Sequence, residues 1–121
     1  MRYAAMLTAA VLAWPVLAQA EGDPAAGKTV FNKCAACHSI KAGENKIGPS
    51  MHGIIGRPSH SVAGFNYSEP MKAYNVTWDR PTMDAYLVNP RATVPGTRMI
   101  FAGLKSADER SNLIAYLETL K

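Results

Sequence analysis

Hydrophobic and polar residues alternate differently along five parts of this chain. Residues 3–18 are mostly apolar. Two later segments, 24–36 and 106–121, carry apolar residues at the spacing of three and four that places them on one face of a helix. Residues 38–67 and 90–105 show no sustained period, and no segment gives a strong strand signal. The pattern therefore predicts an all-α fold with long loops.

Four helices are predicted, over residues 24–36, 68–74, 79–88 and 106–121. Each begins at a residue whose side chain can accept a hydrogen bond from the first helical turn. The last helix also has a glutamate three residues after its cap, which forms a capping box. The four caps are Asp23, Ser68, Asp79 and Ser106, and the apolar face of the last helix carries Leu113, Tyr116, Leu117 and Leu120.

The apolar segment at the start of the chain has the layout of a secretory signal peptide. Arg2 is its only charge, and it ends in A-Q-A, a small-x-small cleavage site. An uncleaved membrane anchor is the alternative, but the apolar run is short for a bilayer span and Pro15 interrupts it. We therefore expect cleavage after Ala20 and export to the periplasm. Residues 21–121 are then long enough for one small domain and no second core.

The long loop of residues 38–67 needs something other than helix packing to hold it. It is rich in Gly, Pro, Ser and Asn, and a structureless stretch of this length is unusual in a compact domain. The apolar side chains of so short a chain are too few to organise the loop alone. A large buried cofactor would supply the missing contacts.

The only two cysteines lie three positions apart, in the sequence C-A-A-C-H at residues 34–38. Cys-x-x-Cys-His is the attachment motif of c-type haem. Cysteines at i and i+3 at a helix end lie on one side, where both thiols can add to the vinyl groups at one edge of a porphyrin. The next residue falls over the ring face, where its imidazole can bind iron. We therefore predict one covalent haem c, held by Cys34 and Cys37, with His38 as the proximal iron ligand.

Other uses of two cysteines explain the sequence less well. Export makes a disulfide the default, but closing the short loop between Cys34 and Cys37 adds little stability. A zinc site needs more ligands, and a thioredoxin-like motif needs a βαβ pattern that this sequence lacks. A haem-free disulfide module would also leave the long loop unexplained.

The second axial position of the iron has several candidate ligands. We expect His52 and His60 to be exposed loop residues. The ordinary role of a methionine is core packing, and Met83 lies within a predicted helix. Met99 differs, because the proline and glycine of V-P-G-T-R-M fix a non-helical turn that presents its sulfur from a loop. A neutral thioether favours ferrous iron and raises the reduction potential. The other methionines after the haem motif are Met51 and Met71.

Further motifs follow one another along residues 27–120. They read G-K-T-V-F-N-K-C-A-A-C-H, G-P-S-M-H-G-I-I-G-R, G-F-N-Y-S, A-Y-L-V-N-P, P-G-T-R-M-I-F-A-G and N-L-I-A-Y-L, with Trp78 as the lone tryptophan after the leader. In this order they resemble the class I cytochromes c of the mitochondrial and bacterial cytochrome c2 type. The resemblance implies the cytochrome c fold, with three main helices, short helices and long loops wrapped around one covalently bound haem.

The resemblance also implies the ligands of the iron. Met99 matches the distal ligand. Pro49 matches the proline whose carbonyl accepts the ring N–H of His38, a bond that orients the imidazole and raises its donor strength. Two methionines depart from the family pattern, because Met51 stands where leucine is usual and Met71 where many relatives have an asparagine.

Other residues match the surroundings of the haem and the packing of the helices. Buried propionates need hydrogen-bond partners, since an unpaired carboxylate is very costly in an apolar pocket. Arg57, Tyr67 and Trp78 match these partners, and Thr97 matches a hydroxyl near a propionate. Tyr86 matches the tyrosine near the methionine sulfur. Gly27 and Phe31 match the face of the first helix that crosses the last helix in this family. The crossing lies near Leu113 and Tyr116.

Charge adds a prediction about partners. Without Arg2, twelve basic residues face nine acidic ones, a net charge of about +3 that is dispersed along the chain. This favours weak docking to an acidic protein surface over nucleic acid. The resemblance implies a cytochrome bc1-type electron donor. It also implies a second partner, which is an oxidase, a photosynthetic reaction centre or a periplasmic dehydrogenase. The protein itself is expected to be a monomer that is not inserted in the membrane. The partner-facing residues are Lys33, Lys46, Arg91, Arg98 and Lys105.

Together these features predict a one-electron carrier and not an enzyme. With His38 and Met99 on the iron, no position is open for a substrate. The alternative from another class is a haem peroxidase or a sensor of CO or NO. It requires that Met99 be absent from the iron or readily displaced.

Overall fold

The computed structural model describes residues 9–13 and 21–121, so most of the predicted signal peptide lies outside the described residues. The described residues contain helices and loops but no strand, and Pro58 and Thr77 form an isolated β-bridge. The prediction of an all-α fold is confirmed. Within the same residues, every helix falls short of the length and apolar character needed to cross a bilayer. The elements are α1 (Pro24–Val30), the 3-10 helix η1 (Phe31–Lys33), α2 (Glu69–Ala73), α3 (Arg80–Val88), α4 (Pro90–Thr93) and α5 (Ala107–Glu118).

The four predicted N-caps are confirmed. The side chain of Asp23 accepts a hydrogen bond from the backbone N–H of Ala25, and that of Asp79 accepts one from Thr82. Ser68 and Ser106 cap α2 and α5 in the same way. Of the predicted capping box of α5, the bond from the Glu109 N–H to the Ser106 hydroxyl forms over 3.2 Å. The carboxylate of Glu109 lies instead 3.5 Å from Lys33, which joins the start of α5 to the end of η1.

Two predictions about helix extent were wrong. The first helix was expected to reach Ala36, but regular α-helix ends at Val30. The winding tightens into the 3-10 turn and continues as single turns, in which the N–H of His38 donates to the Cys34 carbonyl over 3.0 Å. Residues 90–105 were expected to be loop throughout, yet they begin with α4. Asn89 ends α3 and caps α4 by accepting from the Ala92 N–H, so one residue serves two helices.

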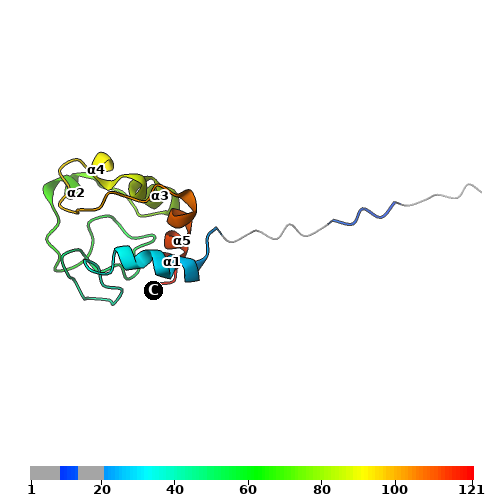
Figure 1. Ribbon diagram of the computed structural model, residues 1–121, viewed down its shortest axis with the longest axis horizontal. Coiled ribbons are helices and arrows are strands. Elements are labelled where there is room, and N and C mark those ends of the chain that lie inside the picture. The colour runs from blue at the N-terminus through cyan, green and yellow to red at the C-terminus, as the bar shows by residue number, and fades with distance from the viewer. Residues whose placement is uncertain (1–8, 14–20) are drawn as a thin grey trace, which may run out of the picture.

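Helices α1 and α5 cross closely and form one side of the core (Figure 1). A Cβ at Gly27 would lie 1.8 Å from the carbonyl oxygen of Asn112, so only glycine allows the two backbones to approach this far. Beside this crossing the rings of Phe31 and Tyr116 pack with centroids 5.5 Å apart. The predicted helix crossing is therefore confirmed.

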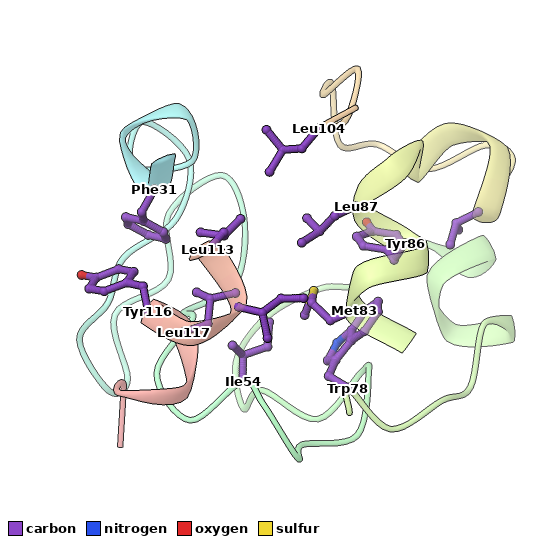
Figure 2. Packing of buried hydrophobic residues seen from close by; sticks show 12 residues of the cluster. Phe31, Ile54, Trp78, Met83, Tyr86, Leu87, Leu104, Leu113, Tyr116 and Leu117 are labelled. Carbon is purple, nitrogen blue, oxygen red and sulfur yellow. The ribbon is translucent and has the colours of Figure 1, made fainter. Parts of the chain in front are cut away.

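The second side of the core comes from α3 and the segment before it. Figure 2 shows Trp78, Met83, Tyr86 and Leu87 opposite the side chains of α5. Five consecutive residues of α5, 113–117, are buried, which is wider than the predicted apolar face. Neighbouring elements therefore cover this helix on more than one side.

Ion pairs hold the periphery of the helices together. The guanidinium of Arg80 lies 2.6 Å from the carboxylate of Glu118 and 3.5 Å from that of Glu21, and it donates to the Glu21 carbonyl over 2.7 Å. Arg110 pairs with Asp84 over 2.8 Å. Arg80 thereby ties the chain before α1 to the start of α3 and the end of α5.

Buried serines of the long loop satisfy backbone groups both within the loop and in the segment that follows α2. The Ser59 hydroxyl donates to the Tyr74 carbonyl over 2.7 Å and accepts from the Val76 N–H over 3.1 Å. Ser50 donates to the Lys41 carbonyl over 2.6 Å. These bonds fix the loop that forms one wall of the site described next.

Candidate functional site

A cavity of about 490 Å³ lies between the long loop, α3 and the loop that follows α4. Its lining is mainly apolar, and Phe31, Leu113 and Leu117 extend it to the α1–α5 crossing. All ten residues predicted to bind or surround a haem line this one cavity. They are Cys34, Cys37, His38, Pro49, Arg57, Tyr67, Trp78, Tyr86, Thr97 and Met99.

The two cysteines and the histidine occupy the turn that follows η1. Both thiols are free. Burial, with a smaller contribution from Cys37, raises the pKa of Cys34 to about 11. The Gly48 N–H donates to the Cys37 carbonyl over 2.8 Å, which packs the long loop against the motif. Cys34 and Cys37 therefore form part of the cavity wall.

His38 is oriented by a hydrogen bond to the long loop. Its Nδ1 lies 2.8 Å from the carbonyl oxygen of Pro49, as predicted for the proximal residue. Burial lowers the pKa of His38 below its usual range, although the bond to Pro49 opposes this effect. A neutral imidazole with Nδ1 engaged leaves Nε2 as the atom able to bind a metal.

Met99 lies in the loop after α4, next to the buried hydroxyl of Tyr86. The Tyr86 hydroxyl donates toward the Met99 sulfur over 4.0 Å, and burial raises the pKa of Tyr86 to about 12. The rings of Trp78 and Tyr86 pack with centroids 4.8 Å apart. The Met99 N–H donates to the Thr97 hydroxyl over 3.3 Å. The sulfur therefore lies beside the Tyr86 hydroxyl, on a loop that an internal hydrogen bond holds.

Arg57 shows what kind of group the cavity accepts. Its two terminal nitrogens donate to the carbonyls of His52 and Ser50, at 2.8 Å and 3.0 Å. Its Nε is buried and has no hydrogen-bond partner. A buried, unused guanidinium donor calls for an anion such as a carboxylate. Tyr67 accepts a bond from the Val62 N–H and keeps its own hydroxyl proton to donate.

This set of residues fits a haem better than a bare metal ion. Among residues 9–13 and 21–121, no group of three or more His, Cys, Asp and Glu side chains could hold a metal ion. A large apolar cavity with two thiols, a neutral imidazole and an unsatisfied guanidinium matches the chemistry of an iron porphyrin with carboxylate substituents.

Comparison with known proteins gives the same result. Residues 24–121 match the cytochrome c family. The chain belongs to this family. Cytochrome c-554 of Methylosinus trichosporium is 49% identical over 122 residues, which cover 97% of this chain and 92% of that protein. Cytochrome c type-1 of Ascaris suum is 52% identical over 99 residues (81% and 88%), and cytochrome c2 of Rhodomicrobium vannielii is 43% identical over 114 residues (93% and 91%).

The predicted fold and cofactor are therefore confirmed for this cytochrome. It has the all-α cytochrome c fold, its cofactor is haem c, and its C-A-A-C-H sequence carries the two cysteines that fit covalent attachment. It is an electron carrier.

Sequence reasoning missed one residue that positions His38. A Cβ at Gly48 would lie 2.3 Å from Cε1 of the His38 ring, so the imidazole packs directly on the Gly48 backbone. No feature of the neighbouring sequence indicates this contact. Hydrophobic lining residues were also missed, because they come from separate segments that only the fold brings together. They are Ile47, Ile54, Phe65, Leu87, Ile100 and Phe101.

The predicted exposure of the remaining histidines was right for one of them. His60 is exposed and lies 3.1 Å from the Asn75 side chain. His52 is half-buried, because its carbonyl accepts from Arg57 and its N–H donates to Ser50. The five predicted partner-facing residues, Lys33, Lys46, Arg91, Arg98 and Lys105, are all exposed, and Lys33 and Arg98 also line the cavity.

Proposed function

We propose that this cytochrome is a periplasmic one-electron carrier in which His38 and Met99 both bind the haem iron, so that it is not an enzyme. In this proposal, residues 1–20 are a signal peptide that is removed, and residues 21–121 form the mature domain. The observation that carries the proposal is that His38 and Met99 line one cavity, and each is held by a contact of its own.

Haem c supplies reversible one-electron chemistry at its iron when it is bound. Cys34 and Cys37 hold it covalently. Pro49 holds the His38 proton at Nδ1 and so leaves Nε2 as the iron ligand. Tyr86 directs its hydroxyl toward the Met99 sulfur and orients the second ligand. Two protein ligands leave no iron position for a substrate.

The polar residues of the cavity lining support the same proposal. Arg57, Tyr67, Trp78 and Thr97 line the cavity with donors that suit the two carboxylates of a haem. The apolar lining excludes water from the iron, which keeps the change of surroundings between the two oxidation states small. Neither oxidation state then requires a large movement of the protein.

Exposed cations near the cavity support docking to an acidic redox partner. Arg98 is exposed at the cavity and its side chain is fixed by donation to the Asn66 carbonyl over 2.8 Å. Such cations increase association rates and matter less at high salt. By family resemblance the partners are a cytochrome bc1-type donor, and an oxidase, a reaction centre or a dehydrogenase.

Visible spectroscopy of the reduced holoprotein, before and after addition of CO, tests the ligation. We expect sharp low-spin bands that CO leaves unchanged. A shift on CO addition in the unmodified protein would show a weak or missing sixth ligand and would favour the peroxidase or sensor alternative.

Docking is tested with a matched pair of charge variants. Arg98→Gln should slow electron transfer to an acidic partner, and the difference should shrink as salt rises. Lys28→Gln removes the same charge from an exposed residue of α1 and is the control. Equal effects of the two variants would count against a docking surface at the cavity.

A further inference from the structure

Every methionine of residues 21–121 lines the same cavity. The proposed function uses only the thioether of Met99 and leaves Met51, Met71 and Met83 without a role beyond packing. A thioether is a competent ligand for haem iron wherever it can reach the metal. The position of each methionine in the fold decides whether it could take over from Met99.

Two of the three methionines are badly placed for this. The Met51 N–H donates to the carbonyl of Ser39, the residue after His38, over 2.8 Å. Met51 therefore belongs to the segment that carries the proximal ligand. Met83 is 2% exposed and is fixed on α3 among the core side chains of Figure 2. Neither can move to the Met99 position without disrupting its neighbours.

Met71 comes from a segment that is joined to the Met99 loop. The Arg98 guanidinium donates to the Asn66 carbonyl over 2.8 Å. A Cβ at Gly96 would lie 3.2 Å from Cγ of Pro70, the residue before Met71. Residues 66–71 and 96–99 are therefore neighbours at two points, and Met71 and Met99 line the same cavity from these joined segments.

The helix that carries Met71 is weakly held. Helix α2 has five residues, none of them buried, and its cap is the 3.3 Å bond from the Met71 N–H to the Ser68 hydroxyl. Methionine has three rotatable side-chain bonds and adapts to irregular space. A small shift of α2 together with a rotamer change would move the sulfur within the cavity.

We propose that Met71 is a reserve distal ligand, which binds the haem iron when the Met99 sulfur is lost from it. This inference rests on the proposed function, in which Met99 is the resident ligand. The exchange breaks one iron–sulfur bond and forms another. Because both sulfurs are neutral thioethers, no proton or electron is transferred.

Such a ligand would keep the iron closed after damage to Met99. Oxidation of a methionine to its sulfoxide converts the thioether into a polar group with different binding properties. An iron left with one free position would bind small molecules such as CO and react with peroxide. With Met71 in reserve, the protein remains a low-spin carrier.

The test compares holoprotein variants by CO binding to the ferrous state and by reduction potential. Met99→Ala removes the resident sulfur and makes room beside Tyr86. We expect this variant to remain largely low-spin and to bind CO slowly and incompletely. The double variant Met99→Ala/Met71→Leu should bind CO fully and lose the high potential. Leucine keeps the volume of methionine, so packing changes little.

Met99→Ala/Met83→Leu is the matched control, because it also removes a second cavity thioether, and it should behave like Met99→Ala alone. Full CO binding by Met99→Ala, unchanged in either double variant, would overturn the proposal for Met71 and leave Met99 as the ligand. Loss of low-spin bands in Met71→Leu alone, with Met99→Ala unaffected, would instead overturn the proposed function. Urea unfolding of each variant identifies any that fail to fold.

Discussion

The backbone of Gly27 in α1 lies directly against that of Asn112 in α5, so closely that a side chain at position 27 would overlap the Asn112 carbonyl oxygen. Gly27→Ala should therefore destabilise the protein by about 3 kcal/mol. The gain in helix propensity, about 1 kcal/mol, is too small to compensate. Urea unfolding of the holoprotein measures the change.

Gly43→Ala is the control for this prediction. Gly43 has a φ of +75° but no atom within 4 Å of an added Cβ. Its substitution should destabilise only by the backbone strain, about 1 kcal/mol. Equal effects at positions 27 and 43 would show that close packing of the two helices is not what makes Gly27 necessary.

The contact between Gly48 and His38 leads to a second prediction. Gly48→Ala would place a methyl group 2.3 Å from Cε1 of the imidazole and push the ring away from its position. We expect a higher high-spin fraction and faster CO binding in the reduced holoprotein, since a displaced ring binds iron less well. A Gly48→Ala protein with an unchanged spectrum would show that the loop of residues 46–49 can shift to make room.

Substitutions at Arg57 can distinguish the effect of its charge on the reduction potential from the effect of its hydrogen bonds on stability. Arg57→Gln removes a cation beside the cavity and should lower the reduction potential, because a nearby cation favours the reduced haem. It should also destabilise the protein by roughly 1–3 kcal/mol, since the carbonyls of Ser50 and His52 lose a charged donor. Potentiometric titration and urea unfolding measure the two effects.

Arg57→Lys is the matched variant, because it keeps the charge and loses the planar set of donors. It should retain most of the potential and show the loss of stability. If both variants lower the potential equally, hydrogen bonding rather than charge controls it.

Asp79 makes stability depend on pH. Hydrogen bonds with Thr82 hold the pKa of the Asp79 carboxyl below its usual range. A carboxyl whose pKa is lower in the folded state stabilises above its unfolded pKa, and this stabilisation is lost as pH falls through the folded pKa. Asp79→Asn keeps a capping oxygen but does not titrate. Its stability difference from the unmodified protein should therefore shrink as the solution is acidified.

Urea unfolding at a series of acidic pH values checks this expectation. Ser68→Ala removes a cap that does not ionise, so its effect should be the same at each pH. A constant difference for Asp79→Asn as well would mean that the carboxylate charge contributes nothing beyond the cap.

Local chemistry made much of the helical structure predictable. Capping by Asp23, Ser68, Asp79 and Ser106 depends on side-chain bonds within three residues, and the sequence alone predicts it. The double use of Asn89 was missed, because Asn-Pro is an equally good stop signal and start signal. The early end of α1 was missed because the apolar period continues through the turns that carry the haem motif.

The site was predictable where one residue type carries the chemistry and not where only packing matters. C-A-A-C-H and P-G-T-R-M define unusual chemical groups in short segments. The apolar lining residues, such as Ile54 and Phe101, have ordinary neighbours in sequence, and only the path of the long loop brings them together. Gly48 belongs to the same class, because nothing nearby in the sequence shows that an imidazole will pack on it.

The size of the cavity bears on how the protein is made in the cell. Much of the apolar lining of the 490 Å³ cavity gains packing partners only when the prosthetic group fills it, and lost packing of this kind is destabilising. Domains of this kind are stable by only about 5–15 kcal/mol in total. The polypeptide without its prosthetic group is therefore expected to be a mostly unfolded, protease-sensitive chain, whose cysteines are accessible for haem attachment. Attachment and folding would then be one event, and chains that fail to receive the group would be degraded instead of accumulating.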